Sequence, residues 1–285
     1  MKKLFAVIFL ILITANSLFA QAKIDSTSKS KIDYLKLSLV GGLTTGAFIY
    51  GYAVQNNLWW KGEKSNFHFE WNYDWKYALG DDKFGHFFFP YLVSNIYSNA
   101  FEWTGINESN SIWYASAFAL LYEAFVEVRD GFSKQWGFSW GDFTADAFGA
   151  SYPVLQHKIT VLKNFNFKIS FYPSDRFKHG SNKVIFDDYE STYDWLSINI
   201  HNLLPDKIKN FYPSFINLAI GHSVEKLDDM GGGNHRFYIG LDWNLEALPG
   251  NGWFLKLLKK YFNYYHFPAP AVQIYPHVIW YGLKF

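Results

Sequence analysis

Hydrophobic side chains recur at two different spacings in this chain, and the change comes near residue 160. After that point apolar and polar residues alternate, as in F-N-F-K-I-S-F at 165–171 and F-Y-I-G-L-D-W at 237–243. A period of two places every second side chain on the same face of a β-strand. Before residue 160 the apolar stretches are long and carry few charges, which favours helices. We therefore expect an α+β fold, in which an N-terminal apolar helical bundle is followed by a C-terminal antiparallel β-sheet or partial barrel.

The alternation predicts individual strands in the C-terminal region. They are expected over 165–171, 196–201, 216–221, 236–245 and 279–285, with weaker support for 183–186; a turn is expected at 228–234 and an amphipathic helix at 253–265. The last strand ends in Phe285 and resembles the closing strand of bacterial outer-membrane proteins. Such barrels need about eight or more strands. Three possibilities therefore stay open: helices cover the gap, further strands lie within 37–80, or the sheet is a soluble one.

The region before residue 160 contains four long apolar stretches. We expect helices over 82–103, 111–130 and 139–156, the last of them capped by the Ser139-x-x-Asp142 arrangement. The stretch from Leu37 to Trp60 has no charge and is long enough to cross a bilayer, but a buried glycine-rich helix or a strand pair fits it as well. Residues 61–80 are rich in aromatic side chains and are expected to be irregular.

The first residues have the form of a targeting segment. Lys2 and Lys3 precede a short apolar run, and Ala20-Gln21-Ala22 fits a signal peptidase site. We interpret 1–22 as a signal peptide and 23–36 as a flexible lead-in. A helical domain over 37–160 and a β-rich region over 161–285 complete the expected organisation.

The composition of the sequence indicates the cellular compartment and the classes of partner to expect. Aromatic residues make up 21% of the sequence, cysteine is absent, and the formal net charge is +1. The balanced charge gives no reason to expect nucleic acid as a partner, and the lack of cysteine excludes disulfides and a lipid-modified cysteine. Aromatic rings favour membrane–water interfaces. We expect an exported protein of the outer membrane or periplasm of a Gram-negative-type envelope, with membrane lipid or envelope components as partners.

Three of the expected helices each carry ionisable residues four positions apart in an otherwise apolar sequence. The pairs are Asp82 with His86, Glu123 with Glu127, and Asp142 with Asp146, and Asp130 lies near the end of the second helix. Residues i and i+4 share one face of a helix. Because a buried charge costs several kcal/mol unless it is paired or bound to a metal, we expect these side chains to converge on one polar site.

The residue types of this cluster suit two kinds of chemistry. A divalent metal such as Zn, Mn, Fe or Mg would find suitable ligands in the set His86, Glu123, Glu127, Asp142 and Asp146. Alternatively, His86 or Glu123 acts as a general base on a phosphate- or glycan-bearing envelope molecule, while Lys83 neutralises an anionic group of that substrate.

Two non-catalytic interpretations stay open beside the metal and acid–base sites. The cluster is then a hydrogen-bonded structural network in an envelope scaffold or assembly protein, or it is the ion or proton path of a small pore or transporter. Taken singly, Asp82, Asp130 and Asp142 also fit ordinary helix caps or solvated helix ends.

The order of the motifs resembles a known family. D-K-x-x-H at 82–86, E-x-x-x-E-x-x-D at 123–130 and F-S-x-x-D-x-x-A-D-x-x-G at 138–149 are similar to the YfiM-like family of uncharacterised, predicted periplasmic lipoproteins. They are more distantly similar to VanZ-like membrane proteins, although G-F-S-K-Q-W-G-F at 131–138 departs from the VanZ-like arginine spacing. The resemblance marks Asp82, Lys83, His86, Glu123, Asp130, Ser139, Asp142, Asp146 and Gly149 as functional positions, and it implies no reaction.

Common signatures of other enzyme classes are absent from the sequence. It contains no G-x-S-x-G, no Walker loop, no H-E-x-x-H and no dinucleotide fingerprint. The C-terminal histidines at 222, 235, 266 and 277 are scattered along the chain, and we assign none of them to the predicted site.

Overall fold

The computed structural model describes residues 31–180, 184 and 187–285. The predicted signal peptide, most of the lead-in and most of the weak strand at 183–186 lie outside these residues. The chain forms two compact units. The helical unit comprises the described part of Met1–Trp71 together with Phe89–His157, and the sheet unit comprises Asn72–Phe88 together with Lys158–Phe285. Helices dominate the first half and an antiparallel sheet the second, so the predicted α+β class is confirmed.

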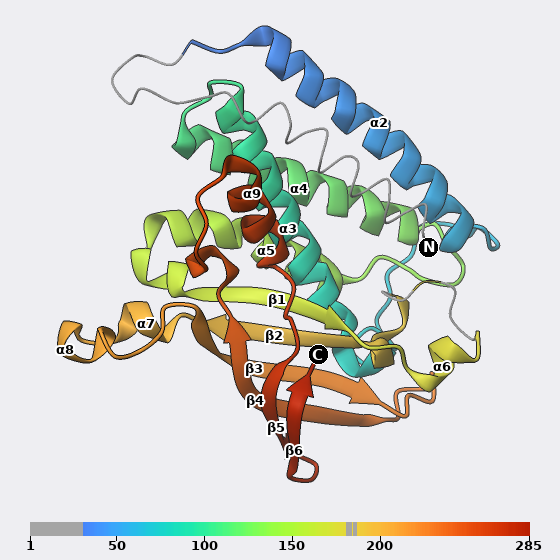
Figure 1. Cartoon of the computed structure of the whole chain (residues 1–285). Helices are drawn as coiled ribbons and strands as arrows, with labels where there is room; N and C mark the ends of the chain where they lie inside the picture. The colour runs from blue at the N-terminus through green and yellow to red at the C-terminus, as the bar shows by residue number, and fades with distance from the viewer. Residues whose placement is uncertain (1–30, 181–183, 185–186) are drawn as a thin grey trace. The chain divides into compact units, whose positions relative to one another are not determined.

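Four long helices occupy the first half of the chain (Figure 1). They are α2 (Tyr34–Leu58), α3 (Asp82–Trp103), α4 (Glu108–Asp130) and α5 (Trp140–Lys158). The side chain of Asn107 accepts a hydrogen bond from the Asn110 N–H at 2.9 Å, so α4 begins slightly before the predicted start. The predicted cap of α5 is confirmed, because Ser139 Oγ accepts a hydrogen bond from the Asp142 N–H at 2.8 Å.

Helix α2 is the apolar stretch for which the sequence left several structures open. It is a single helix whose one buried residue is Val40, and it is long and apolar enough to cross a membrane, with a mean hydropathy of 1.4. The helix begins at Tyr34, inside the predicted lead-in, because the Asp33 carboxylate accepts hydrogen bonds from the N–H groups of Leu35 and Lys36, both at 3.1 Å. By length and composition, α2 is the one such helix among the described residues.

The sheet has six antiparallel strands in sequential order. They are β1 (Phe165–Phe171), β2 (Thr192–Ile198), β3 (Ile216–Glu225), β4 (Asn234–Trp243), β5 (Ala269–Tyr275) and β6 (Ile279–Lys284), with helix α9 (Trp253–Phe262) between β4 and β5 (Figure 1). The expected strand over 196–201 was placed too late, since Asn199 caps a short helix, α7 (Ile200–Leu203). The sequence analysis missed β5, whose Pro270 weakens the strand signal.

The sheet curls instead of lying flat. The outer edge of β1 pairs with the segment just before β5: the Ile169 N–H donates to the Tyr264 carbonyl at 3.1 Å, and the His266 N–H donates to the Ile169 carbonyl at 3.0 Å. From the far end, Lys284 on β6 brings its Nζ within 3.6 Å of the centre of the Tyr193 ring on β2. The strand order nevertheless begins at β1 and ends at β6, so the curled sheet is a partial barrel.

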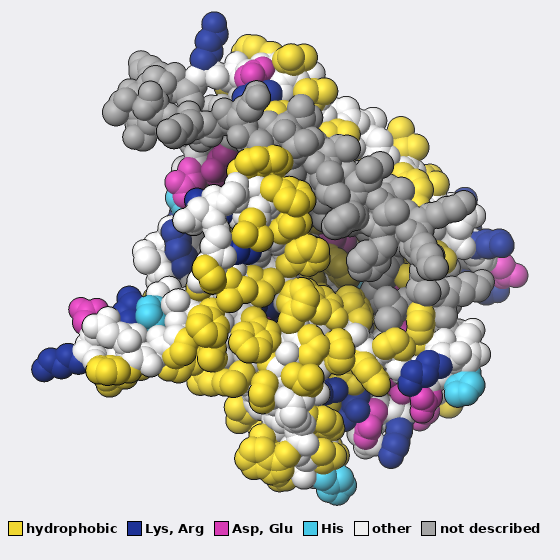
Figure 2. Space-filling model, viewed as in Figure 1, with side chains coloured by type: hydrophobic (Ala, Val, Ile, Leu, Met, Phe, Trp, Pro, Cys, Tyr) yellow, Lys and Arg dark blue, Asp and Glu magenta, His cyan; other side chains and the backbone are white. Residues whose placement is uncertain are grey.

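The two faces of this sheet have the opposite of the usual polarity. The enclosed face carries polar side chains that are at most 3% exposed, among them Lys168, Ser197 and Asp242. The outward face carries large apolar side chains, and Ile220, Ile239 and Trp280 are 51%, 51% and 80% exposed. Figure 2 shows hydrophobic side chains gathered over α9 and the neighbouring strands. Antiparallel sheets that face water usually carry their polar residues outward, whereas strands of membrane barrels carry apolar residues outward.

A charged network fills the enclosed side of the sheet. The Asp242 carboxylate lies 2.6 Å from Lys168 Nζ and 2.9 Å from His266 Nδ1, and it accepts a hydrogen bond from Ser197 Oγ at 2.6 Å. Burial opposes ionisation of Asp242, but the hydrogen bond from His266 and the charge of Lys168 outweigh it and lower the pKa of the carboxyl group. The ring of Trp195 stacks on His266 with a 3.9 Å separation of centroids and closes the network.

Lys284 should give the folded chain a measurable pH dependence. Burial, assisted by the charge of Arg236, lowers the pKa of Lys284 from its ordinary value of 10.5 to about 7. Below pH 7 the amine is protonated in both the folded and unfolded states, and burial of the charge then costs stability. Between pH 7 and 10.5 the unfolded chain binds the extra proton, so this group makes stability rise with pH.

The substitution Lys284→Met should therefore stabilise the protein more at pH 6 than at pH 9, by about 1 kcal/mol or more. Urea unfolding of both variants at the two pH values measures this difference. Lys256→Met, at an exposed position of α9, is the control and should leave the pH dependence unchanged. Equal effects of Lys284→Met at both pH values would contradict the assignment.

Candidate functional site

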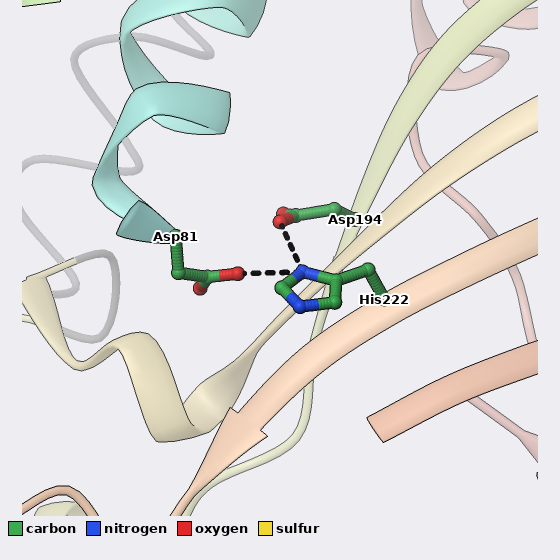
Figure 3. A group of neighbouring side chains, drawn as sticks. All are labelled: Asp81, Asp194 and His222. Atoms are coloured by element: carbon green, nitrogen blue, oxygen red, sulfur yellow. Dashed lines mark ion pairs between the residues drawn. The ribbon is translucent and has the colours of Figure 1, made fainter. Parts of the chain in front are cut away.

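Three ionisable side chains of the sheet unit converge on one point. Asp81, Asp194 and His222 each present a ligand-type atom, and these atoms all lie within 4.8 Å of one another. Figure 3 shows both carboxylates directed at the same ring nitrogen: His222 Nδ1 lies 2.9 Å from Asp81 Oδ1 and 3.7 Å from Asp194 Oδ2. We call these three residues the Asp–His centre.

The sheet register brings two members of the centre together. Asp194 on β2 and His222 on β3 are directly paired across the two strands. Opposite residues in an antiparallel pair have Cβ atoms about 4.5–5.5 Å apart, so the pairing alone places the carboxylate beside the imidazole.

The third member comes from a strained turn. Asp81 follows a short 3-10 helix, Tyr77–Gly80, in which Ala78 and Leu79 have positive φ values of 45° and 58°. A left-handed conformation costs a residue with a Cβ roughly 1–2 kcal/mol. Residues held in such conformations cluster at functional sites, and here the turn delivers Asp81 to the sheet immediately before α3 begins.

Both carboxylates of the centre are buried beside the same imidazole. Asp81 and Asp194 are each 4% exposed, and His222 contacts both of them. Burial and the charge of Asp81 raise the pKa of Asp194 well above its usual range. Two buried carboxylates beside one imidazole are costly, because a single positive charge does not balance both of them, and a bound divalent cation would offset that cost.

His222 is held from both sides of its ring. Burial lowers the pKa of the imidazole, but Asp194 and Asp81 together outweigh burial and raise the pKa to about 9. The other ring nitrogen, Nε2, lies 3.0 Å from Nδ1 of His235 on β4. Burial, followed by the charge of His222, lowers the pKa of His235, which favours a neutral ring that accepts a hydrogen bond.

A cavity of about 220 Å³ lies beside the centre and is formed entirely by the sheet unit. All three members of the centre line it. The other large lining side chains are Phe84, Phe167, Trp195, Leu196, Ile220 and Phe237. The centre therefore supplies the ionisable groups of an otherwise apolar pocket, which is the usual composition of a small-molecule site.

The predicted residues at the start of α3 lie next to this centre in the sequence. Asp82 and Lys83 are buried, and Lys83 Nζ contacts the carboxylates of Asp82 at 2.9 Å and Asp74 at 2.6 Å. The positive charge of Lys83 is thus balanced by two neighbouring acids. His86, one turn further along α3, is half-buried and also belongs to the sheet unit.

The other predicted residues lie in the helical unit. Glu127 and Asp146 are 2% and 0% exposed, and each offers a carboxylate oxygen within 4.8 Å of the other. Glu127 also accepts a hydrogen bond from the Ser139 N–H at 3.0 Å, and Asp130 accepts one from Trp60 Nε1 at 2.7 Å. Glu123 and Asp142 are half-buried, and Gly149 is buried on α5. A single pocket shared by all the predicted residues remains a prediction.

The sequence analysis passed over all three members of the Asp–His centre, although their positions carried a signal. Asp194 is in phase with Leu196 and Ile198, and His222 is in phase with Ile220. An ionisable residue at the apolar phase of two successive strands is unusual. The alternation shows this phase for each strand, whereas the pairing of Asp194 with His222 depends on the register of β2 and β3. Asp81 was overlooked in favour of its neighbour Asp82.

Comparison with known proteins supports the resemblance inferred from the motifs. Residues 70–158 match the model of a family described as predicted periplasmic lipoprotein, DUF2279. The match covers less than a third of the chain. The match includes Asp81 and every residue of the predicted helical cluster, whereas Asp194 and His222 lie beyond it. No curated protein and no solved structure matches the chain, and the VanZ-like similarity finds no support among the matches.

The family description agrees with the expected compartment. A predicted periplasmic lipoprotein domain indicates an exported protein of the cell envelope. The matched stretch includes the turn that carries Asp81, so the Asp–His centre combines one residue within the match with two residues of the β-rich region beyond it.

Proposed function

We propose that this envelope protein binds a divalent metal ion through Asp81, Asp194 and His222, and that the ion holds an anionic group of an envelope molecule in the adjoining cavity. The observation that carries the proposal is the convergence of two buried carboxylates on one imidazole nitrogen beside a cavity. The cavity beside them provides room for the ligand.

The distances within the centre fit a transition-metal site. Zinc bonds to nitrogen and oxygen are about 2.1 Å long, so ligand atoms at tetrahedral angles lie roughly 3.4 Å apart. The two separations at His222 Nδ1, 2.9 Å and 3.7 Å, bracket this value. When His222 Nε2 carries the ring proton, it donates to His235 and leaves the lone pair of Nδ1 directed at the carboxylates. Such an outer hydrogen bond is typical of metal-binding histidines.

The donor set indicates what the ion could do. Two carboxylates and one imidazole suit Zn or Mn, and three protein ligands leave a coordination position for water or substrate. A metal in this position would polarise an anionic oxygen or lower the pKa of a bound water. The protein's own contribution is to hold the three ligands on two neighbouring strands and a strained turn, and to surround them with apolar walls that exclude bulk water.

Isothermal titration of the chelator-treated full chain with Zn²⁺ tests the proposal. We expect saturable binding of one ion and a higher urea midpoint when Zn²⁺ is present, because a ligand that binds only the folded state stabilises it. Asp194→Asn and His222→Ala should each weaken binding by at least about a hundredfold, since loss of a mere outer-sphere partner already costs about 10–100-fold.

Matched variants separate this site from incidental binding by other acids and histidines. Asp206→Asn and His277→Ala alter exposed residues of the same types and should leave Zn²⁺ affinity unchanged. Circular dichroism confirms that each variant is folded. If folded wild-type protein binds neither Zn²⁺ nor Mn²⁺, or if Asp194→Asn binds as tightly as wild type, the centre is a proton-sharing network and the metal proposal is wrong.

The helical unit offers a second candidate for the predicted metal ligands. Glu127 and Asp146 are both buried and lie close enough to share an ion. Glu123 and Asp142 stand on the same two helices, α4 and α5. We retain this acidic pair as a proposal, and the two substitutions in the Asp–His centre distinguish it, because they would leave an ion bound at Glu127 and Asp146 in place.

We also propose that the protein is associated with the outer membrane. The apolar outward face of the sheet and the amphipathic helix α9, with exposed Trp253 and Phe254, support contact with lipid. Membrane lipid and other envelope components are then the partners of these surfaces. The polar enclosed side of the partial barrel is consistent with the same location.

A further inference from the structure

We infer that the ligand of the Asp–His centre is an amphiphile: an anionic phosphate-type head group bound at the metal, with an aliphatic chain that leaves the cavity over Ile220 and Phe237. This inference rests on the proposed metal site and deepens it by assigning the class of ligand. Three observations support the assignment: the composition of the cavity walls, the size of the cavity, and the apolar surface onto which the cavity opens.

The walls of the cavity are hydrophobic and aromatic. Phe84 stands opposite Phe167 with ring centroids 6.2 Å apart, and the Phe237 ring lies 5.0 Å from the His222 ring. Beyond the Asp–His centre, no lining residue is charged or carries a polar side chain other than the indole of Trp195. That indole N–H is already used, because it donates to Ser170 Oγ at 2.9 Å. Outside the Asp–His centre, the cavity lining has no free polar side chain with which to bind the hydroxyls of a sugar.

The cavity is too small to enclose a complete lipid or drug-sized molecule. Its volume of about 220 Å³ falls below the roughly 300–1,000 Å³ of pockets that enclose such ligands. A head group with a few carbon atoms fits, and the rest of the molecule must lie outside. A ligand that met water at the rim would need polar groups there.

The rim of the cavity is apolar and continues onto the outward face of the sheet. Ile220 and Phe237 line the cavity and are 51% and 41% exposed. In the register of β3 and β4, Ile220 pairs with Ile239 and Leu218 pairs with Leu241, so an uncharged path leads from the rim along the two strands. An aliphatic chain would cover these side chains and remove their apolar surface from water.

The head group follows from the electrostatics of the centre. With a divalent ion bound, the charges of two carboxylates and the metal cancel, and the remaining coordination position accepts an oxygen donor. A phosphate-type oxygen is a hard anionic donor that suits this position, whereas a cationic head group would find no acidic side chain free of the metal in the cavity lining.

Binding of alkyl phosphates of different length to the Zn²⁺-loaded full chain tests the inference. Inorganic phosphate, methyl phosphate and n-hexyl phosphate, each below its micelle concentration, are compared by isothermal titration. Each buried methylene contributes about a fourfold gain in affinity. We expect n-hexyl phosphate to bind at least about tenfold more tightly than methyl phosphate, and inorganic phosphate to bind no more tightly than methyl phosphate.

Variants of the cavity rim test where the aliphatic chain of the ligand lies. Ile220→Ser and Phe237→Ser alter partly exposed residues of the rim and should abolish the preference for n-hexyl phosphate over methyl phosphate. Ile274→Ser, at a similarly exposed apolar position on β5 outside the cavity lining, is the matched control and should retain the preference.

The possible results separate this inference from the metal proposal. Zn²⁺ binding with equal affinity for methyl and n-hexyl phosphate would overturn the amphiphile assignment alone. So would a hexyl preference that survives in the rim variants, or hexyl phosphate binding that survives in Asp194→Asn. Absence of Zn²⁺ binding would overturn the proposed function and this inference with it.

Discussion

Asp242→Leu should destabilise the sheet unit by about 3–5 kcal/mol, because removing one partner of a buried ion pair leaves the other charge uncompensated. The Asp242 carboxylate is 1% exposed and contacts Lys168 Nζ, His266 Nδ1 and Ser197 Oγ. The Lys168 amine is itself 0% exposed, and its remaining partners are the Trp243 carbonyl at 2.8 Å and Asn263 Oδ1 at 3.1 Å. Neither of these can replace a full negative charge. Urea unfolding monitored by tryptophan fluorescence measures the loss.

Two further variants identify the cause of that loss. Glu63→Leu removes an acid from an exposed ion pair with Lys134 and should cost no more than about 1 kcal/mol. Adding Lys168→Met to Asp242→Leu removes the stranded amine as well and should recover part of the stability, since apolar side chains often replace buried ion pairs without loss. If the double variant is no more stable than Asp242→Leu alone, the cost does not arise from an uncompensated charge.

Trp195→Ala should cost a further large amount, about 3–5 kcal/mol, through loss of packing. Trp195 is 0% exposed, stacks on His266 and lies at the centre of a buried cluster with Tyr193, Tyr238 and Ala219. The opposite strand leaves room only for glycine beside it: a Cβ at Gly221 would come within 2.5 Å of the indole ring. The urea midpoint measures the effect.

A matched tryptophan on the surface is the control for this packing argument. Trp253→Ala removes a side chain that is 51% exposed on α9 and should change stability by no more than about 0.5 kcal/mol. A loss in Trp195→Ala no larger than that in Trp253→Ala would show that the interior of the partial barrel tolerates a void and is not a packed core.

The helices and most of the strands could be predicted from the sequence because each depends on local pattern. Long apolar stretches with few charges gave α3, α4 and α5, and the alternation after residue 160 gave every strand except β5. Strand β5 was not predicted because Pro270 interrupts the alternating pattern within the strand and Pro268 precedes the strand. The inverted polarity of the sheet could not be read from alternation, since a period of two identifies two faces without saying which one is enclosed.

The Asp–His centre was missed for a different reason. Its geometry depends on which residue of β2 faces which residue of β3. It also depends on a left-handed turn at Ala78 and Leu79, and neither alanine nor leucine is a residue type that predicts such a turn. Glycine is the residue expected at left-handed positions, so the alanine–leucine pair did not predict this turn. The predicted helical cluster, by contrast, used spacing within single helices, and that spacing could be read directly.

The division of the chain into units has a consequence for how the protein matures. The sheet unit is built from two separated stretches, Asn72–Phe88 and Lys158–Phe285, and β1 gains its edge partner only from Tyr264 and His266. Contacts between residues so distant in sequence form slowly. During export the chain must therefore emerge beyond residue 222 before Asp81 can meet Asp194 and His222. A product truncated before Asp194 would contain the whole DUF2279 match yet lack two of the three residues of the Asp–His centre.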